Sequence, residues 1–204
     1  MRLIQDMEGL ELINLKISRE EAKIAIEKIV RFLEPNEGEL REGLKDTPER
    51  VVKSWEEIFT GYSLNAEKVL ESTFNAEGYD GIVLLKDIEY HSTCEHHLLP
   101  FTGKAHVAYI PVERIVGISK LARLVDLHTK KLQNQERITK GIADDLENIL
   151  SPLGCAVIIE GSHGCMNCRG VKKQNAIMTT SAMRGVFFDK SDARAELMQL
   201  IQGN

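Results

Sequence analysis

Apolar residues recur with the period of a helix in the first part of the chain, at Ala22, Ala25, Ile26, Ile29 and Leu33. Such a stripe lies along one side of an α-helix. Ser18 and Glu21 stand before it as a capping-box pair, in which each side chain satisfies a backbone N–H of the first turn. The pattern predicts a helix from about Arg19 to Leu33, and a second helix that starts near Thr47 and Pro48.

Later segments show the alternation and the β-branched content of strands. Four strands are predicted, at 81–93, 103–111, 154–160 and 176–188. In the second of them Ala105, Val107 and Tyr109 alternate with more polar neighbours, as in a strand with one buried face. Two helical stripes lie between the second and third strands: Leu121, Leu124, Val125, His128 and Leu132, and then Ile138, Ile142 and Ile149.

This order of elements predicts an α+β fold. Residues 1–75 are expected to form an N-terminal helical arm, and residues 76–204 a domain that ends in a short helix. The connections within the first and the last pair of strands are short enough for hairpins. The four-stranded sheet is therefore expected to be antiparallel, with the two intervening helices on one of its faces.

The bulk composition narrows the class of protein. The chain has 204 residues and a formal net charge of −5, which argues against general nucleic-acid binding. Residues 1–20 contain no apolar run of signal-peptide length, and no later stretch is long enough to span a membrane. We therefore expect a cytoplasmic protein without membrane attachment, whose cysteines are metal ligands or free thiols.

Cysteine and histidine cluster in two short segments. Cys94 and His97 are three positions apart, a spacing that lets a tight turn at the end of the strand direct both toward one metal. Cys165 follows in a second segment together with His163. Zinc binds thiolate sulfur and imidazole nitrogen readily, and a zinc ion (Zn²⁺) with three protein ligands keeps one position open for water. Cys94, His97 and Cys165 are therefore candidate zinc ligands of an open, catalytic site.

Cys168 is the alternative fourth ligand. It would close the site, and a closed site would favour a zinc-stabilised scaffold or binding protein over an enzyme. In an extended strand, positions three apart point to opposite faces, so we expect Cys168 to face away from Cys165. A turn at Met166 and Asn167 would change this direction. In an extended segment the rings of His96 and His97 likewise point in different directions. His96 and His163 are then available to transfer protons.

Polar and basic residues gather near two predicted helix starts, where free N–H groups also attract anions, and beside the second segment of cysteine and histidine. Three sets result: Ser119, Lys120 and Arg123; Arg50 and Lys53; and Arg169. Each set alone is most often a solvated surface, but together they indicate a polyanionic substrate. Gln135 and Glu136 begin another predicted helix. A carboxylate there is most often a partner of the helix dipole, but it can also accept two N–H bonds from a flat heterocycle.

Six short motifs carry a resemblance to a known family: TPERVVK (47–53), STCEHH (92–97), GISKLAR (117–123), QNQER (133–137), HGCMNCRGV (163–171) and TTSA (179–182). In this order they resemble the signature of GTP cyclohydrolase I, from about residue 20 onward. The resemblance implies the tunnelling fold, in which subunits pool their sheets into a barrel. It also implies a homo-oligomer, usually a decamer, with active sites at the subunit interfaces.

The resemblance also implies residue roles. Cys94, His97 and Cys165 resemble the zinc ligands, and His96 and His163 resemble the proton-transfer histidines. Glu136 resembles the guanine anchor, with Gln135 beside it. The triphosphate contacts correspond to Lys53, Ser119, Lys120, Arg123 and Arg169, with Arg50 as a further candidate.

The implied reaction converts GTP and water to formate and 7,8-dihydroneopterin triphosphate, the first step of pterin and folate biosynthesis. A zinc-activated water is expected to attack C8 of the purine while His163 protonates N7 and His96 assists ring opening. A nearer alternative is another enzyme of the tunnelling fold that acts on a different purine or pterin. The zinc ligands and the cations favour the triphosphate.

Overall fold

A computed structural model of the chain describes residues 17–35 and 38–203. The chain divides into two compact units between Glu57 and Ile58. The sequence placed the boundary at residues 75–76. Residues 58–75 group with the sheet, because helix α4 (Ala66–Leu70) packs against α5 (Ile118–Thr129) and strand β1 (Thr73–Asn75) pairs with β4 (Arg114–Val116).

The described part of the N-terminal unit consists of helices α1 (Arg19–Leu33) and α2 (Glu42–Lys45) and most of α3 (Thr47–Ile58). Helix α1 has the predicted bounds, and its capping box is formed between Ser18 and Glu21. Ile26 and Val30 of α1 pack with Val52 of α3 in a small apolar cluster. The helical pattern of this part of the chain is thereby confirmed.

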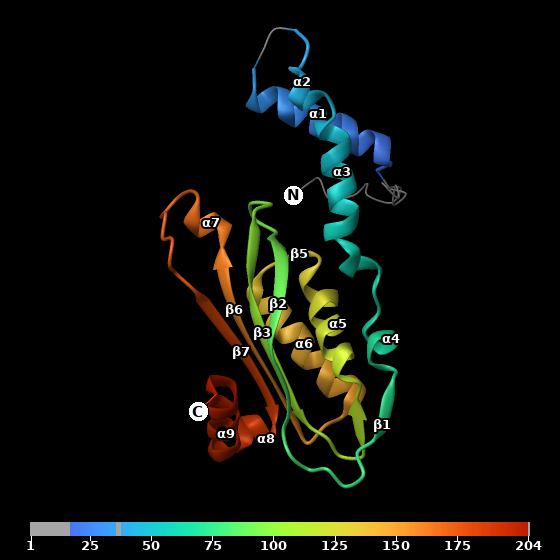
Figure 1. Cartoon of the computed structure of the whole chain (residues 1–204), viewed down its shortest axis with the longest axis vertical. Helices are drawn as coiled ribbons and strands as arrows, with labels where there is room; N and C mark the ends of the chain where they lie inside the picture. The colour runs from blue at the N-terminus through green and yellow to red at the C-terminus, as the bar shows by residue number, and fades with distance from the viewer. Residues whose placement is uncertain (1–16, 36–37, 204) are drawn as a thin grey trace, which may run out of the picture. The chain divides into compact units, whose positions relative to one another are not determined.

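Four antiparallel strands form the main sheet of the second unit (Figure 1). In spatial order they are β2 (Val83–Cys94), β3 (Pro100–Ile110), β6 (Gly154–His163) and β7 (Met178–Gly185). The short strand β5 (Leu132–Gln133) runs parallel to the end of β2. The four predicted strands are confirmed, but the last ends before residue 188, because Gly185 at φ 55° turns the chain into helix α8 (Val186–Asp189).

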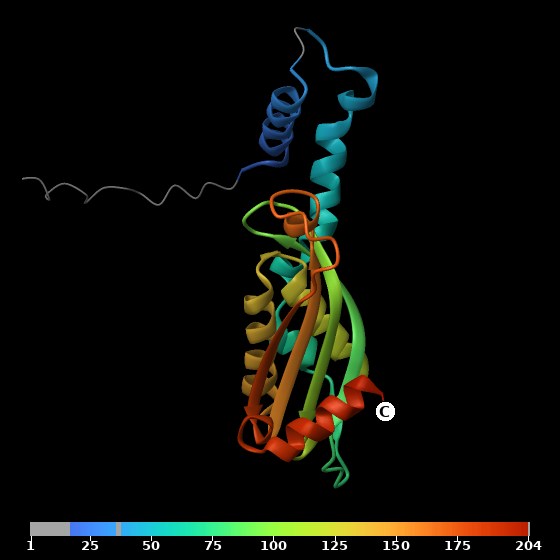
Figure 2. The ribbon, with the colours of Figure 1, turned by 90° about the vertical axis from the view of Figure 1, so that its left-hand side faces the viewer.

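The two faces of this sheet carry different helices. Helices α5 and α6 (Gln135–Leu150) cover one face (Figures 1 and 2), and Val107 and Tyr109 are fully buried beneath them. Helix α8 and the C-terminal α9 (Ser191–Gln202) cover part of the other face, where Phe187 packs on Ala108. As the alternation along β3 predicts, Val107 and Tyr109 face one apolar layer, and Ala108 faces the other. None of the described helices is long and apolar enough to cross a membrane.

One end of the sheet collects the segments that carry the cysteine and histidine motifs. Phe101, near the start of β3, lies opposite Ser92 on one side and His163 on the other. The Ser92 hydroxyl donates to the carbonyl of Thr129 at 2.6 Å, which ties β2 to the C-terminal end of α5. Strands β2 and β6 end, and β3 begins, at this same end of the sheet. Residues far apart in sequence therefore meet there.

Candidate metal and substrate site

A turn after β2 brings a histidine back to the last residue of the strand. Cys94 is buried, its N–H donates to the carbonyl of Leu99 at 2.8 Å, and its own carbonyl accepts from Leu98. Leu98 has the left-handed φ of 54° that this reversal requires. The ring of His97 then lies with Nδ1 3.7 Å from the Cys94 sulfur. The turn expected at the end of the strand is confirmed, so His96 and His97 lie in that turn and not in an extended segment.

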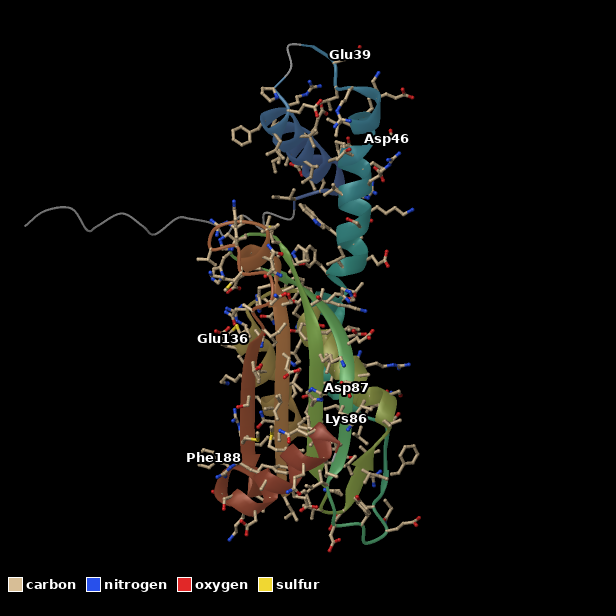
Figure 3. The ribbon with its side chains drawn as sticks, turned by 60° about the vertical axis from the view of Figure 1, so that its left-hand side comes forward. Glu39, Asp46, Lys86, Asp87, Glu136 and Phe188 are labelled. Atoms are coloured by element: carbon tan, nitrogen blue, oxygen red, sulfur yellow. The ribbon has the colours of Figure 1, made fainter. Side chains whose placement is uncertain are left out.

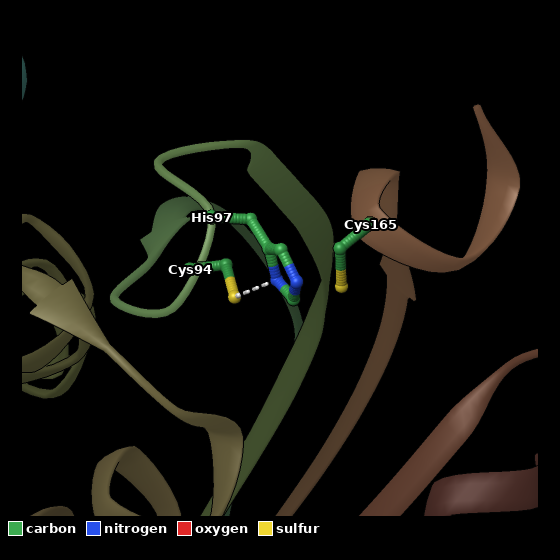
Figure 4. Close-up of side chains that lie close together, drawn as sticks. All are labelled: Cys94, His97 and Cys165. Atoms are coloured by element: carbon green, nitrogen blue, oxygen red, sulfur yellow. Dashed lines mark hydrogen bonds between the residues drawn. The ribbon is translucent and has the colours of Figure 1, made fainter. Parts of the chain in front are cut away.

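Cys165 approaches from a second turn, at the end of β6. The one-turn helix α7 (Gly164–Asn167) begins with a glycine whose added Cβ would lie 2.7 Å from the carbonyl oxygen of Pro100. Glycine therefore permits the close packing of this turn on β3. As a result, ligand atoms of Cys94, His97 and Cys165 all lie within 4.8 Å of one another (Figure 4).

This donor set fits a metal cation. Burial raises the pKa of the Cys165 thiol, and the nearby Cys94 sulfur raises it further. Two thiolates at such a distance repel each other, and a divalent cation between them offsets that repulsion. Within residues 17–35 and 38–203, this is the group of His, Cys, Asp and Glu side chains that could hold a metal.

Cys168 does not belong to that group. The expectation of an extended strand between Cys165 and Cys168 was wrong, since α7 is helical there. The Cys168 side chain is exposed, and its thiol donates to the carbonyl of Gly164 at 3.0 Å. A closed site of three cysteines and one histidine is therefore not what the described residues form.

The second histidine of the site, His163, is held on two sides. Its ring stacks on Phe101 with centroids 4.5 Å apart and planes inclined by 7°. Its Nε2 lies 2.9 Å from the side-chain oxygen of Gln135, which can only accept, so Nε2 carries the proton and Nδ1 keeps its lone pair. Burial lowers the pKa of His163, while the Glu136 carboxylate acts in the opposite sense. His96 is exposed, with Nδ1 3.9 Å from the Cys94 sulfur.

The start of α6 carries both residues of the predicted guanine anchor. Asn134 caps the helix by accepting from the N–H of Arg137. Gln135 is fully buried, and its amide nitrogen donates to the carbonyls of Ile159 and Met178 at 3.0 Å each. Glu136 is exposed, and its position at this end of the helix is marked in Figure 3. The two neighbours therefore differ sharply, one buried in protein contacts and the other open to a ligand.

The predicted phosphate contacts on α5 do not meet the cysteine and histidine group within one chain. Lys120 and Arg123 lie on the first turns of α5 and line a groove of about 510 Å³ together with Lys68 and Lys130. Ser119 is exposed on the same turn. Helix α5 rises by roughly 18 Å over its length, and its opposite end is the one tied to β2 through Thr129. Along the helix axis, Lys120 and Arg123 therefore lie roughly 14 Å and 9 Å from the end of α5 that is tied to β2.

The remaining cations belong to two other segments. Arg169 is exposed in the segment after α7, and its charge acts on the nearby Cys165 thiol, where it lowers the pKa against the effect of burial. Lys53 and Arg50 belong to the N-terminal unit, where both are exposed and Arg50 pairs with Asp46 at 3.3 Å. Within the second unit, the structure thus brings together the three candidate ligands, both histidines, the start of α6 and Arg169.

Several residues near the site were missed by the sequence analysis. Phe101 stacks on His163. Glu95, in the turn of residues 94–98 (the metal turn), pairs with Arg137 of α6. A carboxylate enclosed between candidate ligands was a signal that could have identified Glu95. No periodic pattern identifies Phe101, because its role depends on the register of β3 against β6.

Comparison with known proteins gives a consistent result. The sequence profile of GTP cyclohydrolase I matches residues 22–202. GTP cyclohydrolase 1 of Deinococcus radiodurans is 54% identical over 164 residues, which cover 80% of this chain and 76% of that protein. The Chlorobium chlorochromatii protein of the same name is 51% identical over 179 residues, covering 87% and 80%. That of Brucella canis is 44% identical over 211 residues, covering 98% of each chain.

Proposed function

The chain belongs to the GTP cyclohydrolase I family and has the tunnelling fold of that family, and on this premise we propose which of its residues carry out the reaction. The enzyme converts GTP and water to formate and 7,8-dihydroneopterin triphosphate, the entry to pterin and folate biosynthesis. The observation that carries the assignment of residues is the meeting of Cys94, His97 and Cys165 beside His163 and the start of α6.

We propose zinc as the metal of this group. Two sulfurs and one imidazole nitrogen match the three-ligand set of catalytic zinc, whereas magnesium and calcium prefer oxygen. When bound, zinc supplies a Lewis acid that makes water a nucleophile near neutral pH. Cys94, His97 and Cys165 hold it, and Cys168 stays outside the site.

His163 and His96 are the proposed proton-transfer residues. Gln135 and Phe101 fix the ring of His163, so that Nδ1 is presented in one orientation. Because burial lowers the pKa of His163, its imidazolium form releases the proton on Nδ1 more readily than a solvated histidine does. His96 remains solvated and can exchange protons with water.

The exposed Glu136 carboxylate is the proposed guanine anchor, since one carboxylate can accept both N–H bonds of the guanine edge. Gln135 was predicted as a substrate contact beside it. Its amide is already bonded to protein groups on both its oxygen and its nitrogen. We therefore propose that Gln135 shapes the guanine site mainly by orienting His163.

The triphosphate is proposed to contact Ser119, Lys120, Arg123 and Arg169 and, from the N-terminal unit, Lys53 and Arg50. Within one chain Lys120 and Arg123 lie roughly 14 Å and 9 Å along α5 from its end beside β2. A second copy of the chain can supply them, which supports a homo-oligomer, proposed to be a decamer, with active sites between subunits. A cytoplasmic location is part of the proposal and is supported by the free state of all four cysteines.

One experiment tests the assignment. Protein purified without oxygen and assayed for metal is incubated with GTP, and formate and the dihydropterin absorbance are measured. Both products are expected from the wild-type chain and neither from Cys94→Ala. If zinc-loaded wild-type protein released neither product, the assignment would fail.

A further inference from the structure

Glu95 stands between Cys94 and His97 in the sequence, but its carboxylate binds to a different segment of the chain. Its Oε2 accepts from Arg137 Nη1 at 2.6 Å, and its Oε1 accepts from Arg137 Nη2 at 3.1 Å. Oε1 also accepts from the side-chain amide of Asn134 at 3.1 Å. The Glu95 N–H donates to the carbonyl of Gln133 at 3.0 Å. Glu95 is thus bound at its backbone and at both carboxylate oxygens.

All of these partners come from one short segment, residues 133–137. Asn134 is the cap of α6, and Arg137 lies in its first turn. Between them are Gln135, which holds His163, and Glu136, the proposed guanine anchor. The same turn of helix therefore contacts the metal turn through Glu95 and the proton-transfer histidine through Gln135.

The geometry of the pair resists rotation. An arginine and a carboxylate joined by two parallel hydrogen bonds have a defined relative orientation, which a single contact does not impose. The Glu95 side chain is 26% exposed and that of Arg137 is 55% exposed, so the defined geometry rests on the two parallel hydrogen bonds and on the further contact with Asn134, and not on burial of the pair. Cys94 is attached directly to Glu95, so the orientation of the carboxylate is passed to the ligand next to it.

On the basis of the proposed function, we propose that Glu95 and Arg137 are positioning residues, which hold the metal ligands at a fixed separation from the guanine anchor Glu136. Neither residue touches the substrate. Their effect is to place the reacting carbon of the anchored purine against the metal, and a small displacement of reacting groups lowers the rate strongly. Loss of the pair therefore lowers kcat and metal affinity more than it raises KM.

The test compares Glu95→Gln, Arg137→Gln, Arg137→Lys and the double variant Glu95→Gln/Arg137→Gln in the full chain. The control is Asp144→Asn, since Asp144 is also on α6 and pairs with Arg184 at 2.9 Å with similar exposure. Zinc affinity is measured by competition with a chromogenic chelator, and the ligand field by the visible spectrum of the cobalt-substituted protein. Steady-state kinetics with GTP give kcat and KM.

Each Gln variant is expected to bind zinc about 10-fold more weakly, with an altered cobalt spectrum. At saturating zinc, kcat should fall by about 10-fold, with KM within about twofold of wild type. Arg137→Lys should be intermediate, and the double variant no worse than the weaker single variant, because both remove one interaction. Asp144→Asn should match wild type.

The inference is overturned if both Gln variants keep wild-type metal affinity, cobalt spectrum and kcat, or if their losses multiply in the double variant. Should a Gln variant fail to fold by circular dichroism, Arg137→Lys decides in the same way, since it keeps the charge. A wild-type protein that makes no product would contradict the proposed function instead. In that case the zinc affinities and the cobalt spectra of the variants would still test whether Glu95 and Arg137 position the metal ligands.

Discussion

The imidazole of His163 lies flat on the ring of Phe101, with centroids 4.5 Å apart and planes inclined by only 7°. The register of β6 against β3 puts the two residues directly opposite each other. Phe101 is 1% exposed and belongs to the main apolar cluster. The proposed proton-transfer residue therefore rests on the core of the domain, which restricts its motion.

Phe101→Leu removes the stack while keeping an apolar side chain. We expect a loss of about 1 kcal/mol in the free energy of unfolding and a fall in kcat of about fivefold, in line with the strength of aromatic pairs. Urea unfolding and steady-state kinetics measure the two effects. Phe187→Leu changes another fully buried phenylalanine, in the cluster on the other face of the sheet, and is the control for the loss of apolar contacts alone. Equal kcat in Phe101→Leu and wild type would show that the stack does not orient His163.

Gln135→Met separates two possible roles of Gln135. Because the amide is buried and bonded to His163, we expect kcat to fall about 10-fold while KM changes little, and stability to drop by about 1–3 kcal/mol from unpaired buried groups. A direct contact of the side chain with guanine would instead raise KM. The kinetic constants of the variant with GTP decide between the two.

Substitution of any of the three candidate ligands should have a different effect on zinc binding from substitution of Cys168. Residues that only support a metal ligand contribute about 10- to 100-fold to affinity, so Cys94→Ala, His97→Ala and Cys165→Ala should weaken zinc binding by more than about 100-fold. Cys168→Ser should keep its metal and its activity, since Cys168 lies outside the group. Metal analysis after dialysis is the measurement. Loss of zinc from Cys168→Ser would refute the open site.

Glu136→Gln keeps the shape of the side chain but removes its charge. A charged hydrogen bond contributes about 1.5–3 kcal/mol, so kcat/KM for GTP should fall by about 10- to 100-fold. Glu147→Gln, further along α6, is the matched control and should stay near wild type. Similar values for the two variants would exclude Glu136 as the guanine anchor.

Because His106 is buried, we expect the free energy of unfolding to depend on pH. His106 is 5% exposed, its Nδ1 accepts from the Asp87 N–H at 3.2 Å, and burial lowers its pKa against the opposing charges of Asp87 and Glu160. Lys104 and Lys86 lower it further. The unfolded chain then binds a proton that the folded chain does not. Stability is therefore full above the ordinary histidine pKa of about 6.5 and falls as the pH drops below it.

The measurement is urea unfolding at pH 7.5 and pH 5.5. Wild type should lose stability between them, with His163 contributing in the same sense because its pKa is also lowered. His106→Asn keeps an acceptor for the Asp87 N–H but cannot titrate, so its loss should be smaller, by at most about 1.4 kcal/mol per pH unit. An identical loss in both proteins would contradict this assignment.

Much of the fold follows from local patterns. The capping box at Ser18 and the apolar stripe behind it predicted α1 to the residue, and alternation along β3 predicted which side of Val107 is buried. Strand β5 was missed because two residues have no period, and it forms only because Gln133 lies beside Cys94. Long-range pairing of this kind is not encoded in any window of sequence.

The site was predicted in part for the same reason. Ligand types and spacing identified Cys94, His97 and Cys165, since the chemistry of a donor set does not depend on where a chain turns. The direction of a side chain in a turn does depend on it. Neither the outward carboxylate of Glu95 nor the helical turn before Cys168 could be read from spacing alone.

The open edges of the main sheet have a consequence for how copies of the chain can join. Strand β7 forms one edge, and β5 covers only Thr93 and Cys94 on the other side of β2. The two edges differ, so a contact between β7 of one copy and β2 of the next would be head-to-tail. Each copy would then be related to its neighbour by the same rotation. Such a contact closes into a ring or extends into a filament. In a ring built in this way, the rotation at one edge contact sets how many copies of the chain close it.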